Sequence, residues 1–288
     1  MNRKLEFIAA KKGHCALIDL HRAVGVSKST WYRRQRATVE TNGKSEKKLR
    51  ELIRKLWNDS GQAYGAPRIT LDLRELGLPV NHKRVARIMR EEGVFSCAPH
   101  RPAGTKRRPA AANVDDLVHR HFTVDRANAI WVCDITQIRT RKSWLYLVCF
   151  IDLYSRRVVG YAIGERCTAN LVLQAFRAAL RERQPEAGLI VHTDRGSQFV
   201  SQRFQDAVRG SGCRLSMARP GLGHCADNSV AESFWASLKK ERLNRWRGTS
   251  RSRCIGIIRA YISWYNTLRR HSHLGGVSPN AFEIARAA

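Results

Sequence analysis

Three carboxylates stand where an α/β fold would bring them together. Asp134 lies inside the apolar run 131–136, which is typical of a β-strand, and an acid in such a run is costly to bury without a partner. Asp194 follows a second strand-like run, and Glu232 lies on the helix expected after the last strand. If the strands that precede the two aspartates are neighbours in the sheet, Asp134 and Asp194 converge, and Glu232 can approach from the side.

The expected chemistry of such a group is metal-dependent attack on phosphodiesters. Three carboxylates repel one another and require cations, and hard oxygen ligands select Mg²⁺ or Mn²⁺. Two such ions, about 3.5–4 Å apart, can activate a water or a 3′-OH and stabilise the leaving oxygen at phosphorus. Lys239 follows Glu232 by about two helical turns, so the two share a helix face, and Lys239 could contact a DNA phosphate beside the metals.

Each of these residues also has an ordinary structural interpretation. An isolated aspartate in a strand is more often a cap or an ion-pair partner, and Asp194 followed by Gly196 is compatible with a simple turn. Lys239 alone would be taken for a solvated lysine on a helix surface. Only their combination, in one order of elements on a very basic chain, favours a catalytic site.

The net charge indicates a polyanionic partner. The 288 residues carry 52 basic and 24 acidic side chains, which gives a formal charge of +28. Such an excess opposes folding by self-repulsion, so DNA is the simplest partner, although a membrane surface or mere solubility would also account for the charge. No apolar run approaches the roughly 20 residues of a membrane span, and no secretory signal is present. The eight cysteines form no C-x-x-C pair, which favours a reducing cytoplasm.

The first 95 residues predict two helical DNA-binding regions. In 1–40, residues 16–36 have the spacing of a helix-turn-helix, with Gly25 at the turn, Ser27 as a cap, and Arg33 and Arg34 on the second helix. An ordinary helical hairpin with a solvated basic face is the alternative.

The second region, 41–95, contains an amphipathic helix, a helix opened by Pro67 and a helix capped by Asn81. The last of these presents Lys83, Arg84 and Arg87 as a candidate DNA-binding face. Residues 96–122 are rich in proline and arginine and predict a basic linker.

From residue 123 to 288 the pattern becomes α/β. Strands are expected at 130–138, 144–153, 158–163, 189–193 and 213–217, with helices at 169–183, 201–210, from about 228, and at 253–268. This order is that of an RNase H-like domain, here a mixed five-stranded sheet flanked by helices, preceded by the all-α helix-turn-helix regions. Fold analogy alone does not fix function.

At these residues the chain resembles the second-frame (OrfB-type) transposases of the IS-three family of bacterial insertion sequences, which have a DDE integrase catalytic core. The resemblance covers nearly the whole chain. Its most specific segments are 64–69 (Tyr-Gly-x-x-Arg-Ile), 81–89, 131–136, 152–160 (Asp-Leu-Tyr-Ser-Arg-Arg-Val-Val-Gly), 192–199, 227–234 with Leu238-Lys239, and 265–279, which includes Arg270-His271-Ser272-His273.

The resemblance implies that Asp134, Asp194 and Glu232 are the catalytic acids and ligands of two Mg²⁺ or Mn²⁺ ions, with Lys239 as the basic residue after the glutamate. It also implies the inverted repeats and target DNA as substrates, a homo-oligomer on DNA in the bacterial cytoplasm at the nucleoid, and an upstream-frame OrfA product, free or fused by frameshifting, as partner.

One departure concerns the third acid. Between Asp194 and Glu232 lie 37 residues, two more than the family's usual spacing, and the extra two fall in 218–225. A loop with Gly221 and Gly223 can absorb them. Glu232 is therefore favoured over Asp227, because residues 227–229 indicate a helix start at which Asp227 or Asn228 is expected to be the cap.

Three other functions remain possible on the sequence alone. A catalytically inactive relative acting as a DNA-binding protein would explain the charge and the helical regions but not the three intact acids. A plain RNase H-like nuclease would explain the acids but not the two DNA-binding regions. A basic structural or membrane-surface protein leaves the acids unexplained.

Overall fold

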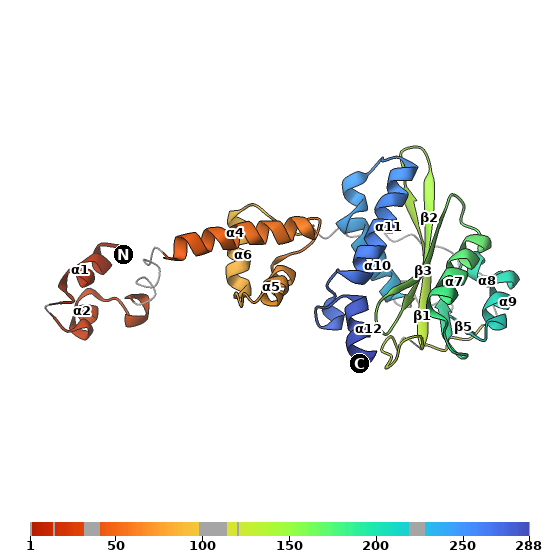
Figure 1. Cartoon of the computed structure of the whole chain (residues 1–288), viewed down its shortest axis with the longest axis horizontal. Coiled ribbons are helices and arrows are strands. Elements are labelled where there is room, and N and C mark those ends of the chain that lie inside the picture. Colours follow the sequence, from red (N-terminus) through yellow and green to blue (C-terminus); the bar gives the residue numbers. More distant parts are fainter. Residues whose placement is uncertain are drawn as a thin grey trace.

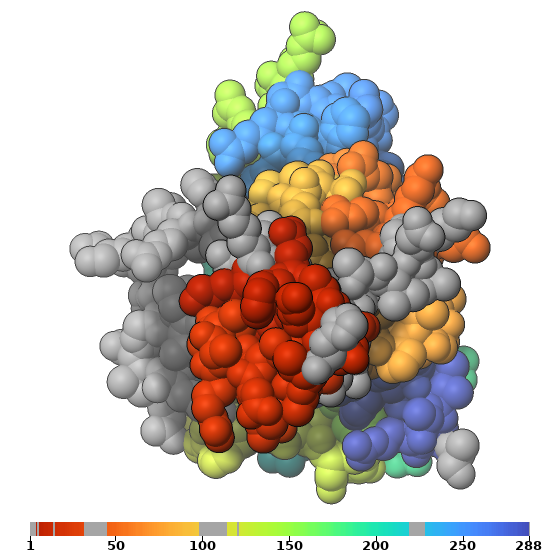
Figure 2. Space-filling model, turned by 90° about the vertical axis from the view of Figure 1, so that its left-hand side faces the viewer, coloured from red at the N-terminus to blue at the C-terminus, as the bar shows by residue number. Residues whose placement is uncertain are grey.

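The computed structural model describes residues 2–13, 15–31, 41–97, 114–119, 121–218 and 228–287. The helical regions occupy one end of the molecule and the sheet the other (Figure 1). Figure 2, which faces the left-hand side of Figure 1, shows the first helices standing in front of α4–α6. No helix within these ranges is long and apolar enough to cross a membrane.

The first unit is built from α1 (Asn2–Lys11) and α2 (Leu17–Val24), followed by a helical turn at residues 28–31. Gly25 has φ +63°, a conformation that favours glycine, and ends α2 as expected. The hydroxyl of Ser27 accepts a hydrogen bond from the backbone N–H of Thr30 at 3.2 Å, which confirms the predicted cap. The sequence reading did not predict α1, and Arg33 and Arg34 lie outside the described residues.

The second unit has its own apolar core between α4 (Thr41–Asp59), α5 (Ala66–Glu75) and α6 (His82–Glu91). As predicted, Pro67 lies in the first turn of α5, and the side chain of Asn81 caps α6 by accepting the backbone N–H of Lys83 at 2.9 Å. The side chains that close this core come from all three helices: Ile53, Ile69, Leu73, Val85 and Ile88.

The third unit is a mixed sheet of five strands in the order β3-β2-β1-β4-β5. Their bounds are β1 Ile130–Arg139, β2 Trp144–Asp152, β3 Val158–Gly164, β4 Ile190–Thr193 and β5 Arg214–Met217. β2 pairs antiparallel with both β1 and β3, whereas β4 pairs parallel with both β1 and β5. The predicted mixed five-stranded sheet is confirmed, with β1 at its centre.

Helices cover both faces of the sheet, and β1 alternates between the two cores. Trp131 and Cys133 face α7 (Ala169–Arg183), α8 (Ser197–Val200) and α9 (Gln202–Gly210), while Val132 faces α10 (Ser229–Glu241) and α11 (Arg251–Thr267) (Figure 1). The approach of β3 to α7 requires Gly160, because a Cβ there would meet the backbone of α7 at 2.5 Å.

The remaining elements surround this sandwich. Two short turns, η1 (Leu243–Trp246) and η2 (Ser272–Leu274), and a final helix, α12 (Pro279–Ala287), complete the chain; the sequence reading did not predict α12. Residues 114–119, expected within the linker, lie against the sheet: the carbonyl of Asp115 accepts the backbone N–H of Met217, and Val118 is buried. Residues 98–113 of that linker lie outside the described ranges.

Candidate active site

The two aspartates lie at the same edge of the sheet. The parallel pairing of β1 with β4 extends as far as Cys133 opposite Thr193. Asp134 follows Cys133, and Asp194 follows Thr193. The condition for the two aspartates to converge, that their strands are neighbours, is therefore met. The negative charge of Asp194 raises the pKa of Asp134, as expected for two carboxylates that share a site.

Both oxygens of Asp134 are held by N–H donors. The indole nitrogen of Trp235 donates to Oδ2 at 2.8 Å, and the backbone N–H of Ile135 donates to Oδ1 at 2.7 Å. Burial nevertheless raises the pKa of Asp134 to about 7, with Asp194 and Glu232 adding to the rise, because the two hydrogen bonds offset only part of it. Without a cation this carboxyl therefore takes up a proton near neutral pH.

Asp194 occupies the turn that leads from β4 into α8. Its Oδ1 accepts the backbone N–H of Gly196 at 2.9 Å. The neighbouring guanidinium of Arg195 fixes the turn, since it donates to the carbonyl of Ala218 at 2.6 Å and to that of Val114 at 2.8 Å. The turn alternative raised by the sequence is thus real, and it holds the carboxylate at the sheet edge.

Glu232 and Lys239 are presented by α10. Glu232 is exposed in the first turn of this helix, and its charge contributes to the raised pKa of Asp134. Burial lowers the pKa of Lys239, and the charge of Asp134 acts in the opposite direction, so the ammonium also lies within the field of that aspartate.

The start of α10 is tied to β1 by Asn228. Its side-chain amide donates to the carbonyl of Cys133 at 2.9 Å, next to Asp134. The sequence predicted that Asn228 or Asp227 would cap this helix. Asn228 takes the cap position but forms no side-chain cap hydrogen bond, because its amide group is directed to the strand instead. Asp227 lies outside the described residues.

The three acids do not form a closed ligand cluster. Among the described residues, no group of three His, Cys, Asp or Glu side chains is close enough to hold a metal ion. Asp134 and Asp194 lie together at the sheet edge. Glu232 lies on α10, and its charge raises the pKa of Asp134. The arrangement offers two carboxylates at the edge of the sheet and a third on a separate helix.

The predicted DNA-binding residues of α6 have different environments. Lys83 is exposed, whereas Arg84 and Arg87 each form an ion pair with Glu46 of α4 at 3.4 Å. Arg87 also pairs with Glu91 at 2.7 Å. The two arginines would have to exchange these partners for a phosphate, and Lys83 would not.

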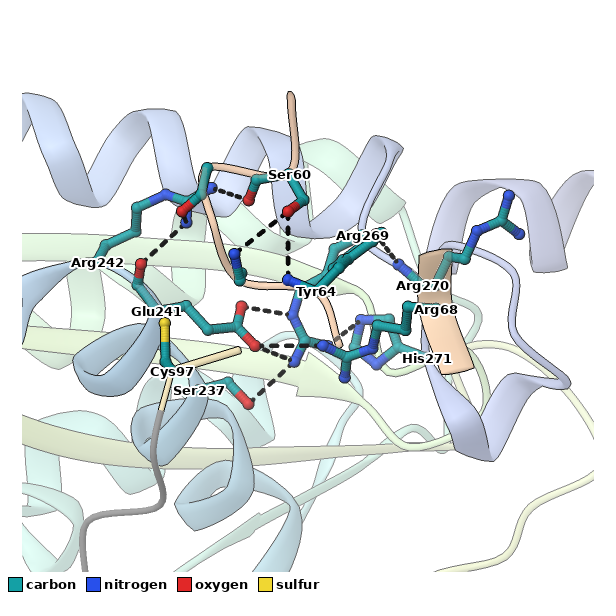
Figure 3. A network of polar contacts seen from close by, with 12 residues as sticks. Ser60, Tyr64, Arg68, Cys97, Ser237, Glu241, Arg242, Arg269, Arg270 and His271 are labelled. Carbon is teal, nitrogen blue, oxygen red and sulfur yellow. Dashed lines mark hydrogen bonds and ion pairs between the residues drawn. The ribbon is translucent and has the colours of Figure 1, made fainter. Parts of the chain in front are cut away.

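Sequence reasoning missed a polar network that joins α5 to α10 and to the end of α11 (Figure 3). At its centre the carboxylate of Glu241 accepts two hydrogen bonds from Arg269, at 2.6 and 2.8 Å, and one from the hydroxyl of Tyr261 at 3.0 Å. Arg68 lies 3.5 Å from the same carboxylate. The hydroxyl of Tyr64 accepts the backbone N–H of Arg270 at 2.8 Å, which fastens the second helical unit to the sheet domain.

Two of the segments that form this network, 64–69 and 265–279, carry the family resemblance, but the resemblance gives them no role. About 200 residues separate Tyr64 from Arg270, and neither segment shows a periodicity that would pair them. Arg242 adds to the junction by donating to the carbonyl of Ser60 at 3.0 Å.

Family models match most of the chain. An HTH-like domain matches residues 44–103, and two models of an integrase core domain match residues 124–222 and 211–279.

Curated relatives are similar along almost their whole length. The insertion element IS600 uncharacterized 31 kDa protein of Shigella sonnei is 37% identical over 261 residues, which cover 90% of this chain and 95% of the relative. Transposase InsF for insertion sequence IS3A of Escherichia coli (strain K12) is 35% identical over 284 residues, which cover 97% of this chain and 98% of the relative.

Solved structures show a more distant similarity. The HTLV-2 integrase catalytic core domain in complex with magnesium (dimeric form) has 21% identity and a TM-score of 0.43, covering 55% of this chain and 97% of that one. A chain of the simian T-cell lymphotropic virus intasome in complex with PP2A regulatory subunit B56 gamma has 16% identity and a TM-score of 0.46, covering 80% and 74%.

Proposed function

The chain belongs to the family of insertion-sequence transposases that includes InsF of IS3A, and from this premise we propose that Asp134, Asp194 and Glu232 form its catalytic centre. It is a DNA transposase with an integrase core domain. The observation that carries the proposal is the parallel pairing of β1 with β4, which ends one residue before both aspartates. Glu232 joins them from α10, where its charge contributes to the raised pKa of Asp134.

The donor set fits a hard divalent cation. Asp134, Asp194 and Glu232 supply only carboxylate oxygens. Burial, and after it the charges of Asp194 and Glu232, raise the pKa of Asp134, and a cation would neutralise those charges. The proposed cofactor is a pair of Mg²⁺ or Mn²⁺ ions. When bound, such ions supply activation of the attacking water or 3′-OH and stabilisation of the leaving oxygen at phosphorus.

The chain's own residues prepare the site for that chemistry. Trp235 and the backbone of Ile135 hold the two oxygens of Asp134, and the backbone of Gly196 holds one oxygen of Asp194. These donors orient the carboxylates before substrate arrives, which lowers the cost of reorganisation during the reaction. Lys239, within the field of Asp134, is placed to bind a phosphate beside the centre.

We propose the following domain organisation of the chain. Residues 1–40 form a helix-turn-helix, 41–95 a second helical DNA-binding domain, 96–122 a basic linker, and 123–288 the catalytic core with its C-terminal helix. The charge of +28 supports binding to the inverted repeats of an insertion sequence and to target DNA. An upstream-frame OrfA product, oligomerisation on DNA and a place at the bacterial nucleoid in the cytoplasm belong to the same proposal.

The alternative is a catalytically inactive relative that only binds DNA. The intact acids at all three expected positions argue against it. The test is to incubate the full chain with DNA that carries the flanking inverted repeats, with and without Mg²⁺ and the upstream-frame product. Mg²⁺-dependent nicking at the element end supports the transposase centre, and joining of the new 3′ end to a second DNA separates it from a plain nuclease.

A further inference from the structure

A polar cavity opens along α10, the helix that carries Glu232. It has a volume of about 290 Å³ and lies between α10, α5, the turn that joins β2 to β3, and the segment after α11. Its wall carries three arginines and two histidines: Arg68, Arg156, Arg269, His271 and His273. Three segments that carry the family resemblance, 64–69, 152–160 and 265–279, therefore meet here.

The positive charge in this wall is only partly neutralised. Glu241 holds Arg269 in a two-pronged ion pair and lies 3.5 Å from Arg68. Arg156 has no ion pair with any acid of the described chain. Its Nη2 reaches the carbonyl of Phe122 at 3.2 Å and the ring of His273 at 2.9 Å.

Arg156 also has an unused donor. Arg156 lines the cavity and is only 9% exposed. Its Nη1 is buried and has no hydrogen-bond partner among the described residues. A buried guanidinium N–H left without an acceptor is unfavourable, and such groups are rare in folded proteins. An acceptor bound in the cavity would satisfy this donor.

The electrostatic field of the cavity points the same way. The pKa of His271 lies far below its ordinary value because of burial and then because of the charges of Arg269, Arg68 and Arg156. The charges of these three arginines, which line the cavity, would attract an anion.

Hydroxyl groups of α10 also line the cavity. Ser229, Ser233 and Ser237 follow one another at intervals of four residues, so they share one face of α10. Ser229 also begins this helix of 13 residues, where unpaired backbone N–H groups favour negative charge. Arginines in the same cavity as serines at a helix start match the oxygens of a phosphate group.

We propose that this cavity, named here the phosphate cavity, binds a backbone phosphate of DNA next to the catalytic centre. Glu232 lies between Ser229 and Ser233 in the same turn of α10. The cavity also shares Arg68, Ser233, Ser237 and Arg269 with a larger groove of about 520 Å³, which continues to Lys239 and Lys240. The two together form a basic path along α10, and the assignment of DNA as the occupant rests on the proposed function.

Ser237→Asp is the decisive variant, because it places a carboxylate inside the cavity, where Arg269 already lies 3.3 Å from the serine hydroxyl. Serine and aspartate have similar helix propensities, and the new carboxylate gains a cationic neighbour, so the variant is expected to fold. Ser263→Asp, on the exposed side of α11, is the control with the same change in charge. Arg156→Gln is a second variant that removes the unpaired cation without adding an acid.

The first measurement is thermal unfolding of the full chain in inorganic phosphate and in chloride at equal ionic strength. Phosphate should raise the melting temperature of the wild type and of Ser263→Asp, and it should have no such effect on Ser237→Asp or Arg156→Gln. Equal phosphate responses in all four proteins would overturn the proposal.

The second measurement is the salt dependence of binding to duplex DNA without divalent metal. Loss of one phosphate contact should reduce the slope of log K against log salt by about 0.9, which is roughly a threefold smaller loss of affinity between 50 and 200 mM salt. This reduction is expected for Ser237→Asp and Arg156→Gln relative to Ser263→Asp.

If phosphate stabilises the wild type but the DNA slopes agree, the cavity takes free phosphate and the DNA assignment is wrong. Because no metal is present, neither measurement depends on cleavage. A failure of the proposed catalytic function would instead appear as absent Mg²⁺-dependent nicking by a wild type that binds DNA normally.

Discussion

The indole nitrogen of Trp235 lies 2.8 Å from Oδ2 of Asp134. This hydrogen bond links the central strand β1 to α10, the helix that also carries Glu232. One helix thus contributes both an acid and a donor that orients another acid. Outer hydrogen bonds of this kind commonly set the affinity and geometry of metal sites.

Trp235→Phe should weaken the site without emptying the core. The variant keeps most of the aromatic packing but removes the N–H, so the pKa of Asp134 should rise further and the carboxylate should bind Mg²⁺ less well. We expect about a tenfold higher Mg²⁺ requirement for nicking, with the rising limb of the pH profile moved to higher pH. Trp246→Phe, at an exposed tryptophan, is the control. A pH profile that Trp235→Phe leaves unmoved would remove Trp235 from the role of positioning residue.

Asp134 should make the metal-free protein less stable as pH rises. Its pKa is about 7 in the folded chain and 3.8 as a model value, so between these pH values the folded state binds more protons than the unfolded state. The free energy of unfolding should therefore fall between about pH 4 and pH 7, by at most on the order of 4 kcal/mol from this residue.

The measurement is denaturant unfolding in chelator across that pH range. Asp134→Asn has no titrating group at this position, so its stability should fall less over the interval. Mg²⁺ at pH 8 should recover stability in the wild type more than in the variant. Parallel pH curves for the two proteins would show that Asp134 does not titrate in this way.

Glu241 should be needed to join the second helical unit to the core. Glu241→Gln leaves the buried guanidinium of Arg269 without its countercharge, and breaking a buried pair costs roughly 3–5 kcal/mol. Arg269 lowers the pKa of Glu241, so this stabilisation is present above the ordinary glutamate pKa and is lost as pH falls through the depressed value. The difference in the free energy of unfolding between variant and wild type should therefore be largest at pH 7 and become smaller at acidic pH.

Denaturant unfolding of the variant and the wild type, at pH 7 and at a pH below the depressed pKa of Glu241, measures this difference in the free energy of unfolding. Glu186→Gln is the matched control, because Glu186 is almost fully exposed and its pairing with Arg126 is long, at 3.9 Å. If the two variants unfold alike at pH 7, the Glu241–Arg269 pair does not stabilise the junction.

The sequence predicted those parts of the site that depend on local pattern. The apolar runs around Asp134 and before Asp194 identified two strands, and the convergence of the two aspartates depended on these strands being neighbours, which the β1–β4 pairing shows them to be. Glu232 was predicted from its place on the helix after the last strand, on the same face as Lys239, and the family resemblance supports the same residue. Its assignment as a catalytic acid remains a prediction.

The parts that were missed depend on contacts between distant segments. The bond from Asn228 to the carbonyl of Cys133 replaces the expected helix cap, and the pattern around Asn228 fits both outcomes. The junction of Tyr64 with Arg270 and the approach of Arg156 to His273 bring together residues far apart in the chain. Such contacts follow from the packing of whole units and leave no periodicity in either segment.

The choice of third acid can be tested directly. Glu232→Gln should eliminate Mg²⁺-dependent nicking with little loss of stability, because Glu232 is exposed. Asp227→Ala should leave nicking detectable, because Glu232 and not Asp227 is the proposed third acid, and Asn228 holds the cap position of α10. Nicking and unfolding measured on both variants decide between them; nicking retained by Glu232→Gln and lost in Asp227→Ala would transfer the role to Asp227.

The central claim is that carboxylates at the β1–β4 edge carry the chemistry, and Asp134→Asn tests it most directly. The amide is close in shape to the carboxylate but removes its charge, whereas the basic surface that binds DNA is unchanged. End-labelled DNA with the inverted repeats should be nicked and joined to a second DNA by the wild type in Mg²⁺. The account predicts that Asp134→Asn binds this DNA with unchanged affinity and performs neither step; undiminished cleavage by that variant would contradict it.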